Sequence, residues 1–308
     1  MPPPPPVINA WINPQQAGIA LPANDSCPRA QILFDFTKFM SMETNMSPTI
    51  HPVALTIAGS DSGGGAGIQA DLLTFAAHGV FGTTAITCLT AQNPDGVTAI
   101  EALPAGFVGE QIKQVHRYFH LGALKTGMLY SAEIVEVVAE FLRSHRAIPA
   151  VIDPVMVATS GAALLMPEAR AALRDRLLPL AAVVTPNLDE VAVLLGDKPA
   201  TPAEMAAAGR TLARTYGVPF LVKGGHLAGD GLADVLVAPD GTAKTYSARR
   251  IPGVDTHGSG CTLSAAIAAN LAKGLDLEPA VAAARAYLQR GLQQGLLLGA
   301  RRFINHRP

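Results

Sequence analysis

Short apolar runs of strand length alternate with longer amphipathic segments from Val53 onward, and this alternation predicts a series of β-strands and α-helices. The predicted strands are residues 53–58, 83–91, 123–127, 150–155, 182–187 and 220–225. Most of them are continuous apolar runs, which is typical of strands buried on both faces of a parallel sheet. We therefore expect an α/β fold, a three-layer α/β/α sandwich with a mostly parallel central sheet.

The alternation of predicted strands and helices is interrupted near the C-terminus. Residues 233–248 form two alternating runs joined by Pro-Asp-Gly, a pattern that predicts an antiparallel hairpin at a sheet edge. Two helices are predicted after it, one that begins near Gly260 and one over roughly residues 277–298. We expect one domain over residues 51–300, followed by a tail at 301–308.

The first fifty residues differ in kind, with a proline run, scattered polar residues and no sustained period. This composition predicts a disordered extension. An alternative is that the natural start lies near Met46, downstream of Met40 and Met42, and that the preceding residues belong to an over-extended gene. N-terminal sequencing of the native protein distinguishes the two.

Polar and glycine residues gather where the predicted strands end, at 59–61, 92–93, 126–128, 153–154, 186–187 and 224–226. For any single loop, ordinary loop composition explains such residues. In open α/β sheets, however, ligands bind at the carboxyl ends of the strands. The repetition at all six ends therefore favours a ligand site along this edge of the sheet.

Composition narrows the class of partner. The chain has 308 residues, 49% of them hydrophobic, and a formal net charge of −1 without a basic run. These values favour a folded protein with a large core and give no electrostatic footprint for nucleic acid or an anionic membrane surface. Cys27, Cys88 and Cys261 are odd in number and widely spaced, which fits a reducing cytoplasm better than a disulfide framework. Every hydrophobic run is too short to span a membrane.

Residues 59–71, GSDSGGGAGIQAD, form a glycine-rich turn between a strand and a helix, a pattern that suggests phosphate or nucleotide binding. The dinucleotide pattern also needs an acidic residue at the end of the second strand, where this chain has Gln92 and Asn93. No Walker A sequence is present. Asp71, early in the next helix, is either a partner of the helix dipole or a ligand contact.

A second group of residues combines carboxylate, amide and amine. Asn187 and Glu190 in TPNLDE are either a helix cap with an acid in its first turn or part of a Mg²⁺ shell. Asp153, at the end of another strand, adds weight to the metal hypothesis. Lys223 leads into Gly224 and Gly225 and either reaches solvent or balances the charge of a phosphate.

The stretch DTHGSGCTLSAA, residues 255–266, places Gly258, Ser259, Gly260 and Cys261 at the start of a helix. First-turn amides and the helix dipole make such an end suitable for an anion. The alternative is that Ser259 is an ordinary helix cap and Cys261 a small core residue. The motif by itself leaves both interpretations open.

Taken together, IAGSDSGGGAGIQAD, AQN, KTGM, DPVM, TPNLDE, VKGGH and HGSGCT resemble the hydroxymethylpyrimidine/phosphomethylpyrimidine kinases of thiamine biosynthesis, in the ribokinase superfamily. The similarity covers roughly residues 52–300. It implies a ribokinase-like fold, ATP and Mg²⁺ as cofactors, a cytoplasmic homodimer, and phosphorylation of 4-amino-5-hydroxymethyl-2-methylpyrimidine and then of its monophosphate.

The resemblance also implies a role for each matching residue. The residues that it implies bind the aminopyrimidine are Gln92, Gly59, Asp71 and Met128, and those that lie toward ATP are Lys223 and Gly225. The residues that it associates with Mg²⁺ are Asn187 and Glu190, with Asp153. It also implies that Gly258, Ser259 and Gly260 bind the phosphoryl group and that Cys261 is the general base.

Three departures from the family pattern are visible, in Ala162, in the C-terminal GARRFINHRP and in the leader. A pyridoxal kinase of the same superfamily and a non-catalytic ligand-binding protein of this fold are the alternative functions.

Overall fold

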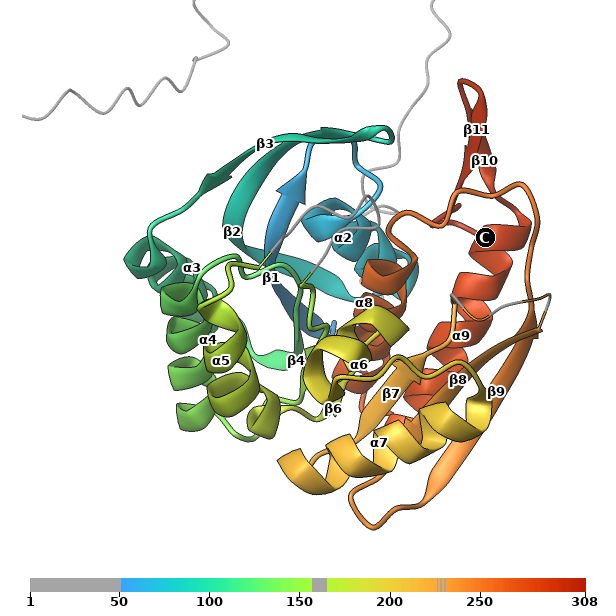
Figure 1. Cartoon of the computed structure of the whole chain (residues 1–308). Helices are drawn as coiled ribbons and strands as arrows, with labels where there is room; N and C mark the ends of the chain where they lie inside the picture. The colour runs from blue at the N-terminus through green and yellow to red at the C-terminus, as the bar shows by residue number, and fades with distance from the viewer. Residues whose placement is uncertain (1–50, 157–164, 226, 228, 230) are drawn as a thin grey trace, which may run out of the picture. The chain divides into compact units, whose positions relative to one another are not determined.

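The computed structural model describes residues 51–156, 165–225, 227, 229 and 231–308. The predictions about residues 1–50, about Ala162 and about His226 lie outside the described residues. One large sheet dominates the described part, with strands in the order β3-β2-β1-β4-β5-β6-β7-β8-β9 (Figure 1). The strands are β1 (Val53–Asp61), β2 (Phe81–Asn93), β3 (Gly96–Ala102), β4 (Leu121–Thr126), β5 (Ala150–Ile152), β6 (Val183–Val184), β7 (Phe220–Lys223), β8 (Gly231–Val237) and β9 (Ala243–Arg249).

The centre of the sheet is parallel and its edges are antiparallel. The six strands β2, β1, β4, β5, β6 and β7 pair in parallel, and each matches a strand predicted from an apolar run. Strands β8 and β9 form the predicted antiparallel hairpin. Strand β3, which pairs antiparallel with β2, was not predicted, because its residues are mostly exposed or half-buried and carry no apolar period.

Helices cover both faces of the sheet (Figure 1). One layer packs on a core that includes Leu55, Ile152 and Phe220, and the other on a core that includes Ala54, Val151 and Leu221. Successive strand residues thus point into opposite cores, as the pleat requires. The first layer contains α3 (Ala105–Tyr118), α4 (Ala132–Ser144), α5 (Ala169–Ala172), α6 (Leu188–Leu195) and α7 (Pro202–Tyr216), and the second contains α2 (Gly67–Ala77), α8 (Ser259–Ala272) and α9 (Leu277–Gln293).

Helix α5 continues into a π-helical turn (Leu173–Leu177) and a 3-10 turn (Leu178–Leu180). The three layers and the mostly parallel sheet confirm the predicted fold class.

The prediction that the last helix runs to about residue 298 is wrong. Helix α9 ends at Gln293, and a small antiparallel hairpin follows, made of β10 (Leu296–Leu298) and β11 (Arg301–Phe303). The leucine run continues the apolar pattern of the helix in sequence, but its three side chains are exposed. A Cβ at Gly295 would lie 2.9 Å from the carbonyl oxygen of Phe303, so glycine permits the close return of the chain.

The segment predicted as a C-terminal tail, 301–308, packs against the two C-terminal helices. Ile304 and His306 are buried, and the hydroxyl of Tyr287 on α9 donates to the carbonyl oxygen of His306 at 3.0 Å. His306 Nε2 lies 3.1 Å from the hydroxyl oxygen of Thr262 on α8. These contacts connect the C-terminus to the helix whose start carries Cys261.

Candidate active site

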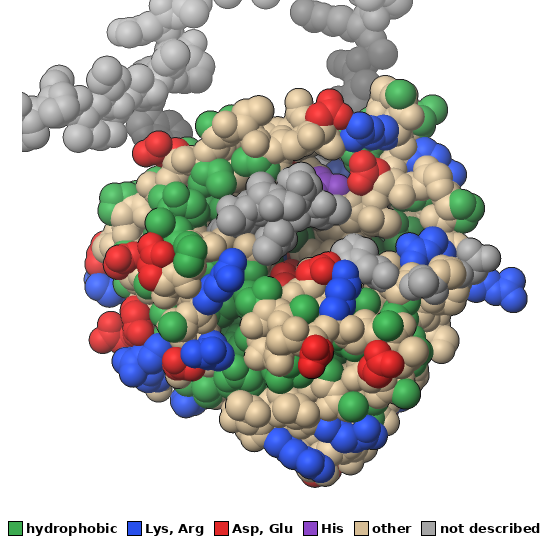
Figure 2. Space-filling view, in the orientation of Figure 1, with side chains coloured by type: hydrophobic (Ala, Val, Ile, Leu, Met, Phe, Trp, Pro, Cys, Tyr) green, Lys and Arg blue, Asp and Glu red, His purple; other side chains and the backbone are tan. Residues whose placement is uncertain are grey.

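A cavity of about 850 Å³ lies along the carboxyl ends of the parallel strands. Figure 2 shows this face of the molecule hollowed near its centre, with acidic side chains and a histidine at the margin of the hollow. All six strand ends singled out in the sequence contribute to the lining. The predicted site residues that line it are Gly59, Gln92, Met128, Asp153, Asn187, Glu190, Lys223, Gly225, Gly258, Ser259, Gly260 and Cys261. Asp71 is the one predicted site residue that does not.

The glycine-rich turn after β1 is organised around its own carboxylate. Asp61 accepts hydrogen bonds from the backbone N–H groups of Gly63 at 2.7 Å, Gly65 at 3.1 Å and Ala66 at 2.8 Å. These amides are therefore already satisfied and are not free to hold a phosphate. The glycines serve close backbone packing instead: a Cβ at Gly67, whose φ is +57°, would lie 2.4 Å from the carbonyl oxygen of Gly59.

Asp71 forms an ion pair with Lys125, a cavity-lining lysine that was not predicted from the sequence. Its carboxylate oxygens lie 2.8 and 3.0 Å from Lys125 Nζ, and Thr56 donates to it at 2.6 Å. Both side chains of the ion pair are fully buried, and Lys125 lines the cavity. Burial alone would lower the pKa of Lys125, but attraction to Asp71, Cys261 and Asp153 together outweighs burial and raises it, so the ammonium stays charged. A lone lysine inside the apolar run ALKTG was the signal available in the sequence.

The start of α8 forms a second glycine turn, and its residues line the cavity. Gly258 has φ +77°, and a Cβ there would lie 1.8 Å from the carbonyl oxygen of Gly65, so only glycine lets the two turns pack together. The amides of Gly260 and Cys261 belong to the first helical turn and have no acceptor within the helix. Lys223 Nζ lies 3.2 Å from the Cβ position of Gly260. Positive charge and free amides thus meet at one point, which suits an anion.

Cys261 lies at this helix end and lines the cavity. Burial raises the pKa of its thiol, and the carboxylates of Asp71 and Asp153 add to the rise, whereas Lys125 and a hydrogen bond from the Gly67 amide oppose it. The net direction of the pKa shift is upward, so the start of α8 does not produce a resting thiolate. The thiol is protonated near neutral pH.

The carboxylates on the other side of the cavity are tied to nearby cations and amides. Lys223 Nζ lies 2.7 Å from Asp153 Oδ1, and both side chains are largely buried. Asn187 and Glu190 form a reciprocal capping box at the start of α6, with each side chain accepting from the backbone N–H of the other, at 2.9 and 2.8 Å. The helix-cap interpretation is thus correct for this pair, and it leaves a metal-associated role open.

The oxygen donors fit a hydrated Mg²⁺ ion better than a closed metal cage. Among the residues that the structure describes, no group of three or more His, Cys, Asp or Glu side chains could hold a metal by itself. Burial raises the pKa of Glu190 to about 8, with Lys223 opposing and Asp153 adding to the shift. A cation beside Glu190 would favour its ionised form. Asp153, Asn187 and Glu190 therefore match an ion that keeps several waters and is held mainly by phosphates.

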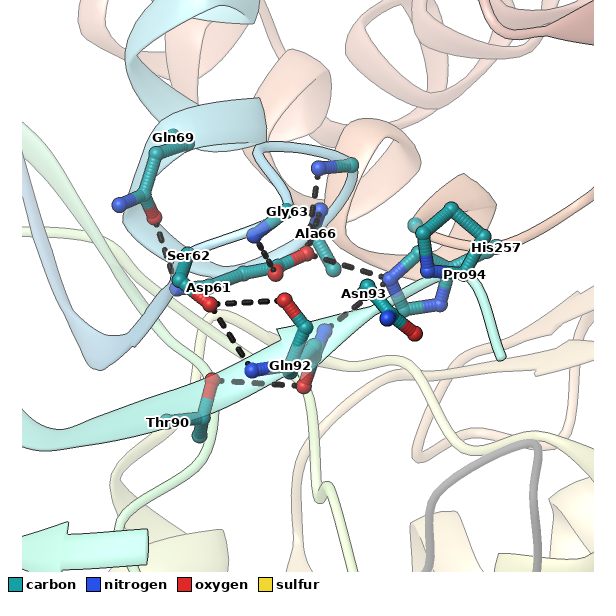
Figure 3. Close-up of polar contacts among 12 residues, drawn as sticks. Asp61, Ser62, Gly63, Ala66, Gln69, Thr90, Gln92, Asn93, Pro94 and His257 are labelled. Carbon is teal, nitrogen blue, oxygen red and sulfur yellow. Dashed lines mark hydrogen bonds and ion pairs between the residues drawn. The ribbon is translucent and has the colours of Figure 1, made fainter. Parts of the chain in front are cut away.

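Gln92, Gly59 and Met128 lie together at the opposite end of the cavity, where β1, β2 and β4 end. A Cβ at Gly59 would lie 2.8 Å from Cys88 Sγ and 3.6 Å from Met128 Sδ, so glycine keeps this wall open. The side chain of Gln92 points from β2 toward His257, in the loop before α8 (Figure 3). His257 stood within the quoted stretch DTHGSGCTLSAA, but nothing in the sequence pattern assigned it a role.

None of the helices in the described part of the chain is long and apolar enough to cross a bilayer. Comparisons with known proteins agree with the family resemblance of the sequence motifs. The family model described as phosphomethylpyrimidine kinase matches residues 61–305. A hydroxymethylpyrimidine/phosphomethylpyrimidine kinase of Rhizobium meliloti is 52% identical over 241 residues, which are 78% of this chain and 90% of that protein.

Two solved structures illustrate the range of similar folds. A phosphomethylpyrimidine kinase from Clostridium difficile superposes with a TM-score of 0.68 at 40% identity, covering 77% of this chain and 98% of that one. A pyridoxal kinase of Bacillus subtilis, solved as an ADP complex, superposes with a TM-score of 0.76 at 36% identity, covering 83% and 97%. The resemblance found in the motifs is confirmed over residues 61–305.

Proposed function

The chain belongs to the phosphomethylpyrimidine kinase family, and from this we propose that it transfers phosphate from ATP to 4-amino-5-hydroxymethyl-2-methylpyrimidine and then to the resulting monophosphate. The observation that carries the proposal is that one continuous cavity is lined both by Gln92 and by the start of α8, whose amides and nearby lysine suit an anion. Membership of this family makes the protein a phosphotransferase, and relatives named as thiamine biosynthesis proteins place such a reaction in that pathway.

ATP is assigned to the end of the cavity formed by Lys223, Gly225 and the first turn of α8. The free amides of Gly260 and Cys261 and the ammonium of Lys223 supply positive potential where charge develops on the transferring phosphoryl group. Asp153, Asn187 and Glu190 would hold Mg²⁺ through water, and the ion would neutralise phosphate charge. Lys125 also lines the cavity, is close enough to Cys261 to lower the pKa of its thiol, and adds a second cation to the same region.

The pyrimidine is assigned to the end formed by Gln92, Gly59 and Met128, because an amide both donates and accepts hydrogen bonds and so matches an amino group beside a ring nitrogen. Asp71 contributes through Lys125 and not by contact. Cys261 then stands where the hydroxymethyl group would meet the phosphoryl group, and we assign it as the general base. Burial raises the pKa of the Cys261 thiol and so opposes its ionisation. The nearby ammonium of Lys125 lowers this pKa and would therefore stabilise the thiolate that accepts the proton of the alcohol.

Pyridoxal phosphorylation is the second candidate, favoured by the close superposition on pyridoxal kinases. Release of ADP from MgATP, measured with the pyrimidine alcohol, its monophosphate, pyridoxal and no acceptor, separates the candidates. We expect turnover with the first two acceptors at a kcat/KM at least tenfold above that with pyridoxal. A higher kcat/KM with pyridoxal contradicts the proposal.

A cytoplasmic location is part of this proposal, because ATP is the phosphoryl donor and Cys88 and Cys261 are free thiols. A homodimer is proposed on the family resemblance alone. Light scattering after size-exclusion chromatography tests it, with the mass of a monomer as the contradicting result.

A further inference from the structure

A buried carboxylate determines where a proton sits beside the pyrimidine end of the cavity. The side chain of Asp61 is 4% exposed, and besides its three backbone amides it contacts His257 Nε2 at 3.2 Å. Burial would raise the pKa of Asp61, but the hydrogen bonds from His257, Ala66 and Gly63 outweigh it and hold the pKa below its ordinary value. Asp61 is therefore ionised and can only accept hydrogen bonds.

His257 Nε2 must consequently carry a hydrogen, because a ring nitrogen without one would direct its lone pair at a carboxylate oxygen. The same nitrogen lies 3.2 Å from Nε2 of the Gln92 side-chain amide as drawn (Figure 3). An N–H that already faces Asp61 can be shared with a second acceptor but cannot accept from a second donor. We therefore assign the Gln92 amide in the reverse of the drawn orientation, with its oxygen toward His257, because the two ends of an amide are distinguished only by their hydrogen-bond partners.

Thr90 supports the same orientation from the other end of the amide. Its hydroxyl donates to the carbonyl oxygen of Ser60 at 2.9 Å, so the oxygen is left as an acceptor. It lies 3.4 Å from the end of the Gln92 amide that does not face His257. With the amide oxygen toward His257, the amide nitrogen lies beside this acceptor, and every polar group in the cluster is matched. The reverse orientation places two donors together at His257.

We propose that His257, held by Asp61, is a positioning residue that fixes the Gln92 amide in one orientation and thereby favours an aminopyrimidine over a pyridine aldehyde. This rests on the proposed function. An aminopyrimidine presents its amino donor and ring-nitrogen acceptor in one order, which one amide orientation matches and the other opposes. Pyridoxal has an aldehyde in place of the amino group next to its hydroxymethyl group. A site whose polar groups are held rigidly discriminates strongly against an analogue that lacks the matching group. A site whose polar groups can reorient discriminates less.

Ser62 provides a matched control, because it holds the backbone of Gln92 and not its amide. Its hydroxyl accepts from the Gln92 N–H at 2.8 Å and donates to the Gln92 carbonyl oxygen at 2.7 Å. Loss of this hydroxyl loosens the backbone of Gln92, so Ser62→Ala should weaken the binding of the pyrimidine alcohol and of pyridoxal by a similar factor. Loss of the His257 N–H should instead change the preference between them.

The test compares His257→Leu, which removes the donor at similar size, with His257→Gln, which keeps an N–H near the position of Nε2. For His257→Leu we expect the KM for the pyrimidine alcohol to rise about tenfold, the value of one hydrogen bond. The ratio of kcat/KM for the pyrimidine alcohol to that for pyridoxal should fall by a similar factor, while the KM for ATP stays within about twofold. His257→Gln should restore most of the ratio, and Ser62→Ala should leave it unchanged.

The proposal is overturned if His257→Leu leaves the ratio of kcat/KM for the pyrimidine alcohol to that for pyridoxal unchanged. It is also overturned if His257→Leu changes this ratio by the same factor in the wild-type protein and in the Gln92→Ala variant. Nitrogen NMR of the wild-type histidines separates this inference from the proposed function. A proton on Nε2 of His257 is expected, and its loss in Asp61→Leu. If the enzyme fails to phosphorylate the pyrimidine, the proposed function fails, and a His257 without a proton on Nε2 overturns the inference whatever the substrate.

Discussion

Replacement of Lys125 by methionine is expected to destabilise the fold strongly and in a pH-dependent way. The ammonium and the Asp71 carboxylate are 2.8 Å apart and both side chains are fully buried, so the substitution leaves a buried carboxylate without a counter-charge. Removal of one partner from such a pair costs about 3–5 kcal/mol of the free energy of unfolding. For a domain of this size we expect the melting temperature to fall by about 6–20 °C.

The pH dependence follows from the carboxylate that remains. Burial raises the folded-state pKa of Asp71, and without Lys125 no ammonium opposes that rise. The folded variant then binds a proton that the unfolded chain releases above about pH 4, the ordinary pKa of aspartate. Its stability therefore falls as the pH rises from about 4 toward the raised pKa. The deficit relative to wild type should be smallest in acid and largest near neutral pH.

Urea unfolding of wild type, Lys125→Met, Asp71→Asn and the double variant from pH 4.5 to 8 measures this effect. Asparagine can still accept from Thr56, so the double variant removes the charges and keeps that hydrogen bond. We expect the double variant to be more stable than Lys125→Met. A loss below about 1 kcal/mol in Lys125→Met, or additive losses in the double variant, would refute a charged buried pair.

Cys261→Ala should slow transfer to the alcohol by about 10²-fold or more and transfer to the monophosphate far less, because only the alcohol must lose a proton; ADP release with each acceptor measures it, and equal losses exclude the base assignment. Because burial raises the pKa of Cys261, the wild-type rate with the alcohol should still be rising with pH at about 8.5, the ordinary thiol value, and the alanine variant should lose this rise. Gly258→Ala should reduce kcat about 100-fold or more, since its Cβ would displace the Gly65 backbone by more than 1 Å; near-normal kcat contradicts the packing of the two turns. Arg301→Ala breaks an exposed pair with Asp95 and should change the free energy of unfolding by less than about 1 kcal/mol in urea; a larger loss would show that the C-terminal hairpin braces the cavity loop.

Local pattern was sufficient for most of the fold. A strand buried on both faces is apolar at most positions, so most of the six parallel strands were visible as continuous apolar runs in the sequence, and the Pro-Asp-Gly turn marked the edge hairpin. Strand β3 and the β10–β11 hairpin were missed because one lacks an apolar period and the other continues the apolar pattern of a helix. Their conformation depends on the strands beside them.

The site shows the same division. The motifs and the family that they resemble were enough to name twelve residues that line one cavity, most of them at or just after the carboxyl ends of parallel strands, which meet at one edge of the sheet. It could not show that Asp71 is paired with Lys125, which lies 54 residues away, or that the first glycine turn is filled by the Asp61 carboxylate.

Nor could it show the protonation of Cys261 or the orientation of the Gln92 amide. Both depend on burial and on partners that are distant in the chain, such as Lys125 for Cys261 and His257 for Gln92. Desolvation and hydrogen bonding act between groups that are close in space. The residue types were therefore determined by the sequence, and their charge states and orientations only by the tertiary structure.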